Sequence, residues 1–175
     1  TPYAVAGGVG GLEAFWLYNV EIKQKIVGLT GIKAVATAGA VVDALKMLKA
    51  NNILVVTPYI DELNVKEREF LEAHGFKVLS IRGLGIIDNT VIGALDPRTA
   101  YETALNAVSQ FKGDFDALFI SCTNWRTFEV IGSLEKVIRK PVISSNSATL
   151  WSIIKELNIK VKLRFDLGSL FSEFM

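Results

Sequence analysis

The sequence has little of several residue types, and each shortage excludes a class of protein. Its 175 residues include one cysteine, so no disulfide can form within the chain, and a reducing compartment, the cytoplasm, is expected. One cysteine and one histidine are too few for a usual zinc site with nitrogen and sulfur ligands. The formal net charge is +1 and no run of Lys and Arg occurs, which argues against a nucleic-acid partner.

Long apolar runs are absent as well. The longest apolar stretches are interrupted within about ten residues, well short of the roughly 20 that a membrane-spanning helix needs. We therefore expect no membrane association. The chain begins at Thr1 without a Met, has no signal-peptide pattern, and enters the Gly-rich stretch 4–11 almost at once. We expect residues to be missing before it.

Strand and helix patterns alternate through most of the chain. Half of the residues are hydrophobic, which is typical of a globular domain with a substantial core. Short apolar runs predict buried strands, and amphipathic segments between them predict helices. The predicted strands are 53–56, 77–81, 117–121 and 141–144, and the predicted helices are 21–29, 41–50, 61–73, 97–111, 126–139 and 147–157. Alternation with short connections predicts an α/β fold with a parallel, doubly wound sheet.

Ligands of such sheets bind beyond the carboxyl ends of the strands, so the candidate site residues are those that follow the predicted strands. Cys122 directly follows a predicted strand and precedes a predicted helix, whose N–H groups and dipole stabilise a thiolate or a bound carboxylate. A buried cysteine acting as a small hydrophobe fits the same position equally well. Ser144 and Asn146 follow the next strand, where helix capping is the simpler interpretation and an anion site the sharper one.

Other candidate residues also have structural interpretations. Tyr59 lies in the loop after the 53–56 strand and is equally explained as a packed ring. Asn89 lies in a glycine-bearing loop, where it is equally explained as a turn former. His74, at a predicted helix end, is a poor base for a Cys-His mechanism. The Gly-rich stretch fails the dinucleotide fingerprint, because Glu13 stands where a third glycine is required.

Several motifs, in order along the chain, carry a resemblance to a known family. Thr-Pro-Tyr-Ile-Asp-Glu-Leu-Asn at 57–64, Gly-Leu-Gly-Ile at 83–86, Ser-Cys-Thr-Asn at 121–124, Lys-Pro-Val-Ile at 140–143 and Ala-Thr-Leu-Trp at 148–151 are the main ones. Together they resemble the maleate cis-trans isomerase and arylmalonate decarboxylase branch of the aspartate/glutamate racemase superfamily. The match covers roughly residues 35–157.

The resemblance implies a parallel-sheet, flavodoxin-like sandwich with two pseudo-equivalent domains, the N-terminal one incomplete here. Residues 1–50 would be the remnant of that domain, 51–157 the second domain, and 158–175 a segment returning to the first. It also implies a small dicarboxylate substrate and no metal, nucleotide or pyridoxal phosphate. The exposed apolar surface of a partial domain is compatible with a homodimer.

The resemblance also assigns roles to residues. Cys122 matches the second of two superfamily cysteines, Tyr59 the carboxylate-binding tyrosine, and Asn89 a polar residue of the substrate pocket. The supporting residues of the expected site are Thr123, Ser144 and Asn146 as donors, and Gly7 and Gly8 in the substrate pocket. Counting back from Tyr59, the first cysteine should fall near Gly7, where this chain has neither a thiol nor a hydroxyl.

These features predict a cofactor-independent decarboxylase or isomerase of small dicarboxylic acids. The decarboxylase branch has glycine at the first position and keeps the second cysteine, so Cys122 would protonate an enediolate. One alternative is a maleate cis-trans isomerase or an amino-acid racemase whose first cysteine is not in this sequence. Another is a non-catalytic module that keeps the carboxylate pocket. A nucleotide-binding flavodoxin-like domain is a third.

Overall fold

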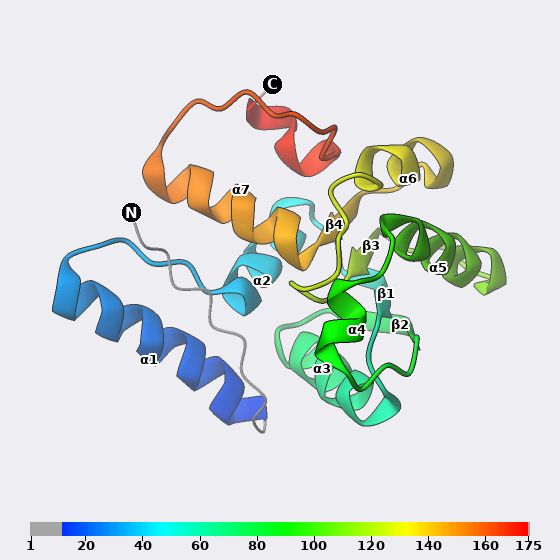
Figure 1. Ribbon diagram of the computed structural model, residues 1–175, viewed down its shortest axis with the longest axis horizontal. Helices are drawn as coiled ribbons and strands as arrows, with labels where there is room; N and C mark the ends of the chain where they lie inside the picture. The colour runs from blue at the N-terminus through cyan, green and yellow to red at the C-terminus, as the bar shows by residue number, and fades with distance from the viewer. Residues whose placement is uncertain (1–11, 175) are drawn as a thin grey trace.

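Helices and strands alternate along the chain as the sequence predicts (Figure 1). The computed structural model describes the backbone of residues 12–174 and the side chains of residues 21–172. Two helices precede the first strand, α1 (Leu12–Thr30) and α2 (Thr37–Met47). Both begin earlier than the sequence predicts. Gly7 and Gly8 lie outside the described residues.

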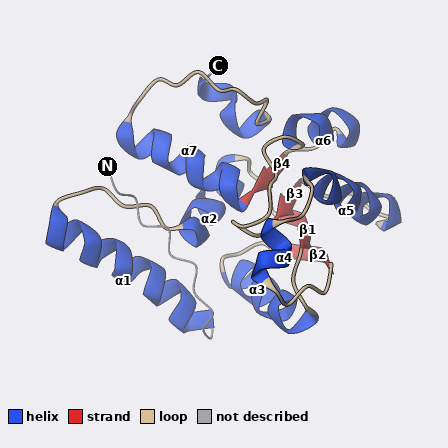
Figure 2. Cartoon of the chain, in the orientation of Figure 1, coloured by secondary structure: helices blue, strands red, loops and turns tan. Residues whose placement is uncertain are grey.

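A parallel sheet of four strands forms the centre of the described structure (Figure 2). β1 (Asn52–Thr57) lies between β2 (Lys77–Gly83) and β3 (Ala117–Ile120), and β4 (Val142–Ser144) lies at the edge beside β3. Every neighbouring pair is parallel. The predicted parallel α/β sheet is therefore confirmed.

Helices cover both faces of this sheet. The segments that follow the strands form α3 (Asp61–Ala73), α4 (Asn89–Gly93), α5 (Pro97–Gln110), α6 (Ile131–Ile138) and α7 (Ser145–Leu157). In Figure 1, α5 and α6 lie on one face, and α2, α3 and α7 lie on the other. Since both faces are covered, all four residues of β3 and the last five of β1 are buried.

The predicted helix at 126–139 is wrong at its N-terminal end. The helix begins at Ile131, and residues 123–130 form a turn-rich loop instead. Contacts distant in sequence hold this loop: the indole N–H of Trp125 donates to Thr99 Oγ1 at 3.0 Å, and Thr127 Oγ1 donates to Ser144 Oγ at 2.8 Å. Burying Trp125 and Thr127 in this way prevents the first turns of the helix from forming there.

The segment after α7 returns to β4 and α7. It ends in the 3-10 helix η1 (Ser169–Phe174), which contacts both elements and buries Phe171 completely. Glu135 of α6 accepts hydrogen bonds from the backbone and the hydroxyl of Ser169 at 2.8 and 2.9 Å. The division into domains 1–50, 51–157 and 158–175 stays a prediction.

The direction of the strand order reverses between the two central strands. The chain moves from β1 outward to β2 on one side, and from β3 outward to β4 on the other. In parallel α/β sheets, this switch point at the carboxyl ends of the strands is where ligands bind. Tyr59 follows β1 there, and Cys122 follows β3.

One glycine leaves room for the loop that carries Tyr59. A Cβ atom on Gly83, at the end of β2, would overlap the carbonyl oxygen of Tyr59 and the side-chain amide of Asn64. Asn64 is itself buried and accepts a hydrogen bond from Thr57 Oγ1 at 2.5 Å. The close approach of β2 to this loop therefore requires glycine.

We expect Gly83→Ala to lower the free energy of unfolding by about 1–3 kcal/mol, because the added methyl group forces the Tyr59 loop to move. Gly28→Ala is the matched control, since a Cβ on Gly28 would meet nothing within 4 Å. That change should leave stability unchanged or raise it by up to about 1 kcal/mol. Urea denaturation measures both, and equal losses in the two variants would contradict the role given to Gly83.

Candidate active site

Cys122 stands in an unusual backbone conformation at the carboxyl end of β3. Its φ angle is 126°, a value that residues with a side chain rarely adopt, and its side chain is only 5% exposed. A non-glycine residue held there costs on the order of 1–3 kcal/mol, and such residues cluster at functional sites. The backbone N–H of Cys122 donates to Ser145 Oγ at 3.1 Å, which ties this residue to the first turn of α7.

The helix beside Cys122 is not the one that the sequence predicts. The helix that follows it in sequence, α6, starts only at Ile131, so the helix-dipole interpretation based on that helix is wrong. The N-terminus of α7 contacts Cys122 instead, through Ser145. The signal for this contact is the run of serines 144, 145 and 147 at the end of β4.

Tyr59 lies against Cys122 from the neighbouring strand end. Its backbone N–H donates to Thr57 Oγ1 at 3.1 Å, and its side chain is near enough to Cys122 and Ser121 for both to affect the pKa of its hydroxyl. Burial is the main cause that raises the pKa of Tyr59, followed by Cys122 and the charge of Glu67, while Ser121 lowers it. Tyr59 therefore stays a neutral phenol at ordinary pH and can donate a hydrogen bond.

A carboxyl group lies behind this pair. Ser121 Oγ, only 4% exposed, donates to Glu67 Oε1 of α3 at 3.0 Å. Burial raises the pKa of Glu67 to about 7, opposed by the hydrogen bond from Ser121. Sequence reasoning missed Glu67. The spacing of residues in α3 could have indicated it. Glu67 lies three residues after Asn64, so the two share one face of the helix, and this face includes the buried residues Asn64 and Leu71.

Asn89 and Asn124 connect the loop of Cys122 to α4. The Asn124 side-chain amide donates to the Asn89 carbonyl at 2.6 Å and to Asn89 Oδ1 at 3.2 Å. Both residues are exposed. A Cβ on Gly93 would crowd the Asn124 amide at 2.9 Å. Asn89 is therefore held by Asn124, which lies two residues after Cys122 in the sequence. None of the hydrogen bonds that Asn89 or Asn124 makes within the described residues reaches Cys122 itself.

Ser144 is committed to holding the fold. It is fully buried, and its hydroxyl accepts from the Ser147 backbone at 3.1 Å and from Thr127 at 2.8 Å. Ser147 reciprocates by accepting from the Ser144 backbone at 2.8 Å, which completes a capping box for α7. Of the two interpretations that the sequence allows for Ser144, helix capping is the one that the contacts support.

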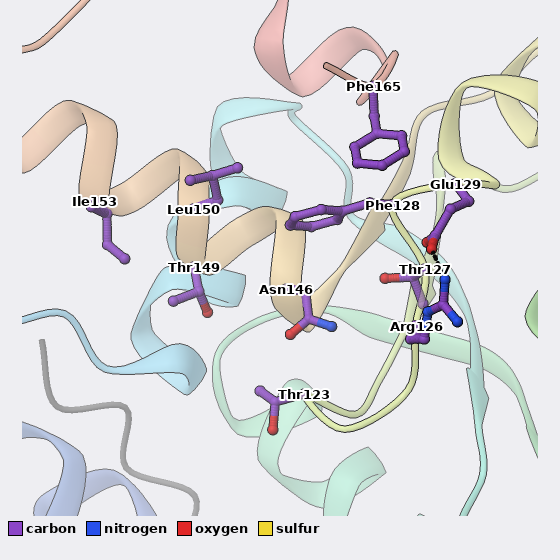
Figure 3. Close-up of a pocket in the computed structure, with 10 residues that line it drawn as sticks. All are labelled: Thr123, Arg126, Thr127, Phe128, Glu129, Asn146, Thr149, Leu150, Ile153 and Phe165. Carbon is purple, nitrogen blue, oxygen red and sulfur yellow. Dashed lines mark hydrogen bonds and ion pairs between the residues drawn. The ribbon is translucent and has the colours of Figure 1, made fainter. Parts of the chain in front are cut away.

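A cavity of about 680 Å³ is lined in part by Thr123, the residue that follows Cys122 in the sequence (Figure 3). Figure 3 shows Phe128 and Phe165 at one end of it and Thr123 at the other. The residues that line it are Thr123, Arg126, Thr127, Phe128, Glu129, Asn146, Thr149, Leu150, Ile153 and Phe165. Two of the expected donors, Thr123 and Asn146, are among them, whereas Tyr59 and Cys122 are not.

The cavity wall is polar where it approaches Thr123. Asn146 donates its amide to the Trp125 carbonyl at 3.0 Å, and Arg126 pairs with Glu129 at 2.6 Å. The Asn146 amide therefore holds the loop after Cys122 against α7. The structure thus brings Tyr59 and Cys122 together, and it places Thr123 and Asn146 on an adjacent wall.

The described part of the chain holds neither a metal-binding cluster nor a membrane-spanning helix. No group of three or more His, Cys, Asp or Glu side chains there is placed to hold a metal ion. No described helix has the length and apolar character needed to cross a membrane. His74 caps the far end of α3, where its Nδ1 lies 2.7 Å from the Phe70 carbonyl.

The chain is similar to known proteins over most of its length. The profile of the family described as arylmalonate decarboxylase matches residues 15–166. The chain is 32% identical over 158 residues to maleate isomerase from Nocardia farcinica, which covers 90% of this chain and 61% of that protein. It is 26% identical over 156 residues to arylmalonate decarboxylase from Bordetella bronchiseptica, which covers 89% of this chain and 65% of that protein.

A solved structure gives the same picture. A mutant of Nocardia farcinica maleate cis-trans isomerase with a covalently bound succinylcysteine intermediate superposes with a TM-score of 0.73 at 26% identity. The match covers 81% of this chain and 59% of that one. The chain spans about three fifths of the length of these relatives.

The raised pKa of Glu67 predicts a pH-dependent stability. The folded state holds a proton on Glu67 up to about pH 7, whereas the unfolded chain releases it near 4.5, so this group lowers wild-type stability as pH rises between those values. Glu67→Gln lacks this loss and should gain stability relative to wild type across that window, with no further gain above it. Urea denaturation at several pH values measures the difference. The exposed Glu69→Gln on the same helix is the control, and an equal gain in that variant would refute the assignment.

Proposed function

The chain belongs to the arylmalonate decarboxylase family, and from this premise we propose that it acts on small dicarboxylic acids without a cofactor, with Cys122 as the proton donor. The relatives named above include a maleate isomerase and an arylmalonate decarboxylase, which are enzymes. The observation that carries the proposal is the position of Tyr59 and Cys122, which follow the adjacent parallel strands β1 and β3 at the switch point of the sheet.

Tyr59 binds one carboxylate of the substrate in this mechanism. Its raised pKa keeps the hydroxyl protonated, so that it donates to the carboxylate rather than repelling it. Thr123 and Asn146 supply further donors from the adjacent cavity wall. Asn89 is linked to the loop of Cys122 by its hydrogen bond with Asn124. An oriented donor of this kind contributes up to about 3–4 kcal/mol when charge develops on oxygen in the transition state.

Decarboxylation then proceeds through an enediolate. The bond between the α-carbon and one carboxylate breaks, carbon dioxide leaves, and the electron pair is delocalised over the remaining carboxylate. The Cys122 thiol transfers its proton to the α-carbon, and the resulting thiolate regains a proton from solvent. Because Cys122 lies on one side of the substrate, protonation of one face follows.

Cis-trans isomerisation is the second candidate. The higher identity to a maleate isomerase, 32% against 26% for the decarboxylase, favours it. The relative with a covalent succinylcysteine shows that a cysteine of that protein adds to its ligand. This chain has one cysteine. A mechanism with two cysteines, as in the isomerase or racemase alternative, requires a thiol outside these 175 residues.

The proposal extends to the compartment. A thiol that donates a proton must stay reduced, and Cys122 has no second cysteine in the chain with which to pair. Cytosolic conditions keep such thiols reduced. We therefore place the protein in the cytoplasm.

Proton NMR in deuterated buffer tests the reaction directly. We expect the protein to decarboxylate phenylmalonate, or to convert maleate to its trans isomer, and we expect Cys122→Ala to abolish the reaction because the proton donor is lost. The aspartate enantiomers, followed by α-deuteration, test the racemase alternative. Turnover that survives in Cys122→Ala would remove Cys122 from the mechanism. Inert behaviour toward every compound, in wild type and variant alike, would leave a carboxylate-binding module.

Tyr59→Phe tests the carboxylate contact. The variant keeps the packed ring and loses only the hydroxyl, so we expect KM to rise on the order of tenfold to a hundredfold, the equivalent of a lost hydrogen bond to a charged group. Steady-state kinetics on the substrate found by NMR measures KM and kcat separately. A KM equal to that of wild type would show that Tyr59 does not bind the carboxylate.

A further inference from the structure

The threonine hydroxyls that line the cavity are not equally available to a ligand. Two of them are committed to the fold, since Thr127 donates to Ser144 at 2.8 Å and Thr149 donates to the Ser145 carbonyl at 2.7 Å. The hydroxyl of Thr123 has no hydrogen bond within the described residues. The polar groups of a ligand are therefore expected at the Thr123 end of the cavity, which directly follows the candidate proton donor in the sequence.

The charged groups of the cavity wall neutralise one another. The two charged residues that line the cavity are Arg126 and Glu129, and they form an ion pair of 2.6 Å. This part of the wall therefore presents no unpaired charge that would attract a carboxylate, and it favours an uncharged part of a ligand.

The end of the cavity away from Thr123 is apolar and aromatic (Figure 3). The ring centroids of Phe128 and Phe165 lie 6.3 Å apart with their planes tilted by 52°, which is a favourable aromatic contact. Leu150 and Ile153 of α7 line the cavity as well. Phe165 is 43% exposed, so a large part of its ring is left for an apolar group of a ligand to cover.

The backbone that follows Phe165 is held firmly against α6. The Asp166 carbonyl accepts a hydrogen bond from the Gly132 N–H at 3.1 Å, and the Asp166 carboxylate pairs with Lys136 at 2.9 Å. A Cβ atom on Gly132 would overlap the Asp166 side chain, so this close approach requires glycine. The Gly168 N–H also donates to Asp166 Oδ1, at 3.2 Å. Phe165 therefore forms a fixed wall of the cavity.

We propose that Phe165 determines the size of the apolar group that the substrate carries. This role rests on the proposed function, in which the diacid reacts at Cys122. The carboxylates lie toward Thr123, and the apolar group extends along the cavity to the rings of Phe128 and Phe165. A cavity of about 680 Å³ has the size of sites for drug-sized ligands, so an unsubstituted four-carbon diacid leaves much of it empty.

Isothermal titration calorimetry with substituted malonates tests whether an apolar group is bound. Every protein in this experiment carries Cys122→Ala, so that the proposed reaction is blocked while binding is measured. We expect phenylmalonate to bind about tenfold to a hundredfold more tightly than methylmalonate, which is the gain from burying a ring-sized apolar group. Equal affinity for the two compounds, or no binding of either, overturns the proposal.

Substitutions of Phe165 should move the size limit in opposite directions. Phe165→Ala lengthens the apolar end, so the affinity for 2-naphthylmalonate relative to phenylmalonate should rise on the order of tenfold. Phe165→Trp shortens this end, so the same ratio should fall, and phenylmalonate itself should bind on the order of tenfold more weakly. The affinity for methylmalonate should be unchanged in both variants, because its substituent does not reach Phe165.

Ile159→Ala is the matched control for these variants. Ile159 belongs to the same segment after α7, is 45% exposed and does not line the cavity, so its variant should keep the ratios of the unsubstituted protein. A ratio that changes in the same direction in Phe165→Ala and Phe165→Trp reports a loosened segment and overturns the proposal, as does a ratio that changes in neither.

Turnover in the protein that retains Cys122 separates this proposal from the proposed function. Size-dependent binding that Phe165 controls, in a protein that decarboxylates none of the three malonates, retains the role of Phe165 and refutes the decarboxylation. Decarboxylation with equal kcat/KM for phenylmalonate and methylmalonate retains the reaction and refutes the role of Phe165.

Discussion

The burial of β1 and β3 on both faces is the constraint from which the candidate site follows. Helices cover each face, so the two strands can carry functional side chains only where they end. Because the strands are parallel and adjacent, their carboxyl ends meet at one edge of the sheet. The residues that follow them, Tyr59 and Cys122, are therefore brought together by the packing of the sheet rather than by any attraction between them.

Polar groups at this edge are satisfied by one another instead of by water. Thr57 donates to Asn64, Ser121 to Glu67 and Thr127 to Ser144, and every one of these hydroxyls is buried. A buried polar group without a partner costs about 1–3 kcal/mol, so each pair fixes the position of both members. These paired side chains fix the strand ends from which Tyr59 and Cys122 extend. The cavity lined by Thr123 and Asn146 is adjacent.

Much of the fold could be predicted from local patterns, but the site depends on contacts that no local pattern contains. The helix at 61–73 is predicted to the residue, because its acidic start and its glycine end are both local signals. The start of α6 is not, since Trp125 and Thr127 are held by residues 26 and 17 positions away. Glu67 was missed because a glutamate on an amphipathic helix usually faces water, and only the neighbouring Ser121 shows otherwise. The family resemblance identified Tyr59 and Cys122, whose roles stay proposals.

The backbone conformation of Cys122 affects any attempt to raise the melting temperature of this protein. A φ angle of 126° is comfortable for glycine and strained for every other residue. Glycine at this position would relax the backbone and raise the melting temperature, and in the proposed mechanism it would also remove the proton donor, so random mutagenesis with a thermal screen would tend to select it. The proposed chemistry therefore puts thermotolerance and reactivity in conflict at this single position. A selection that monitors only heat resistance would drift toward an inert protein.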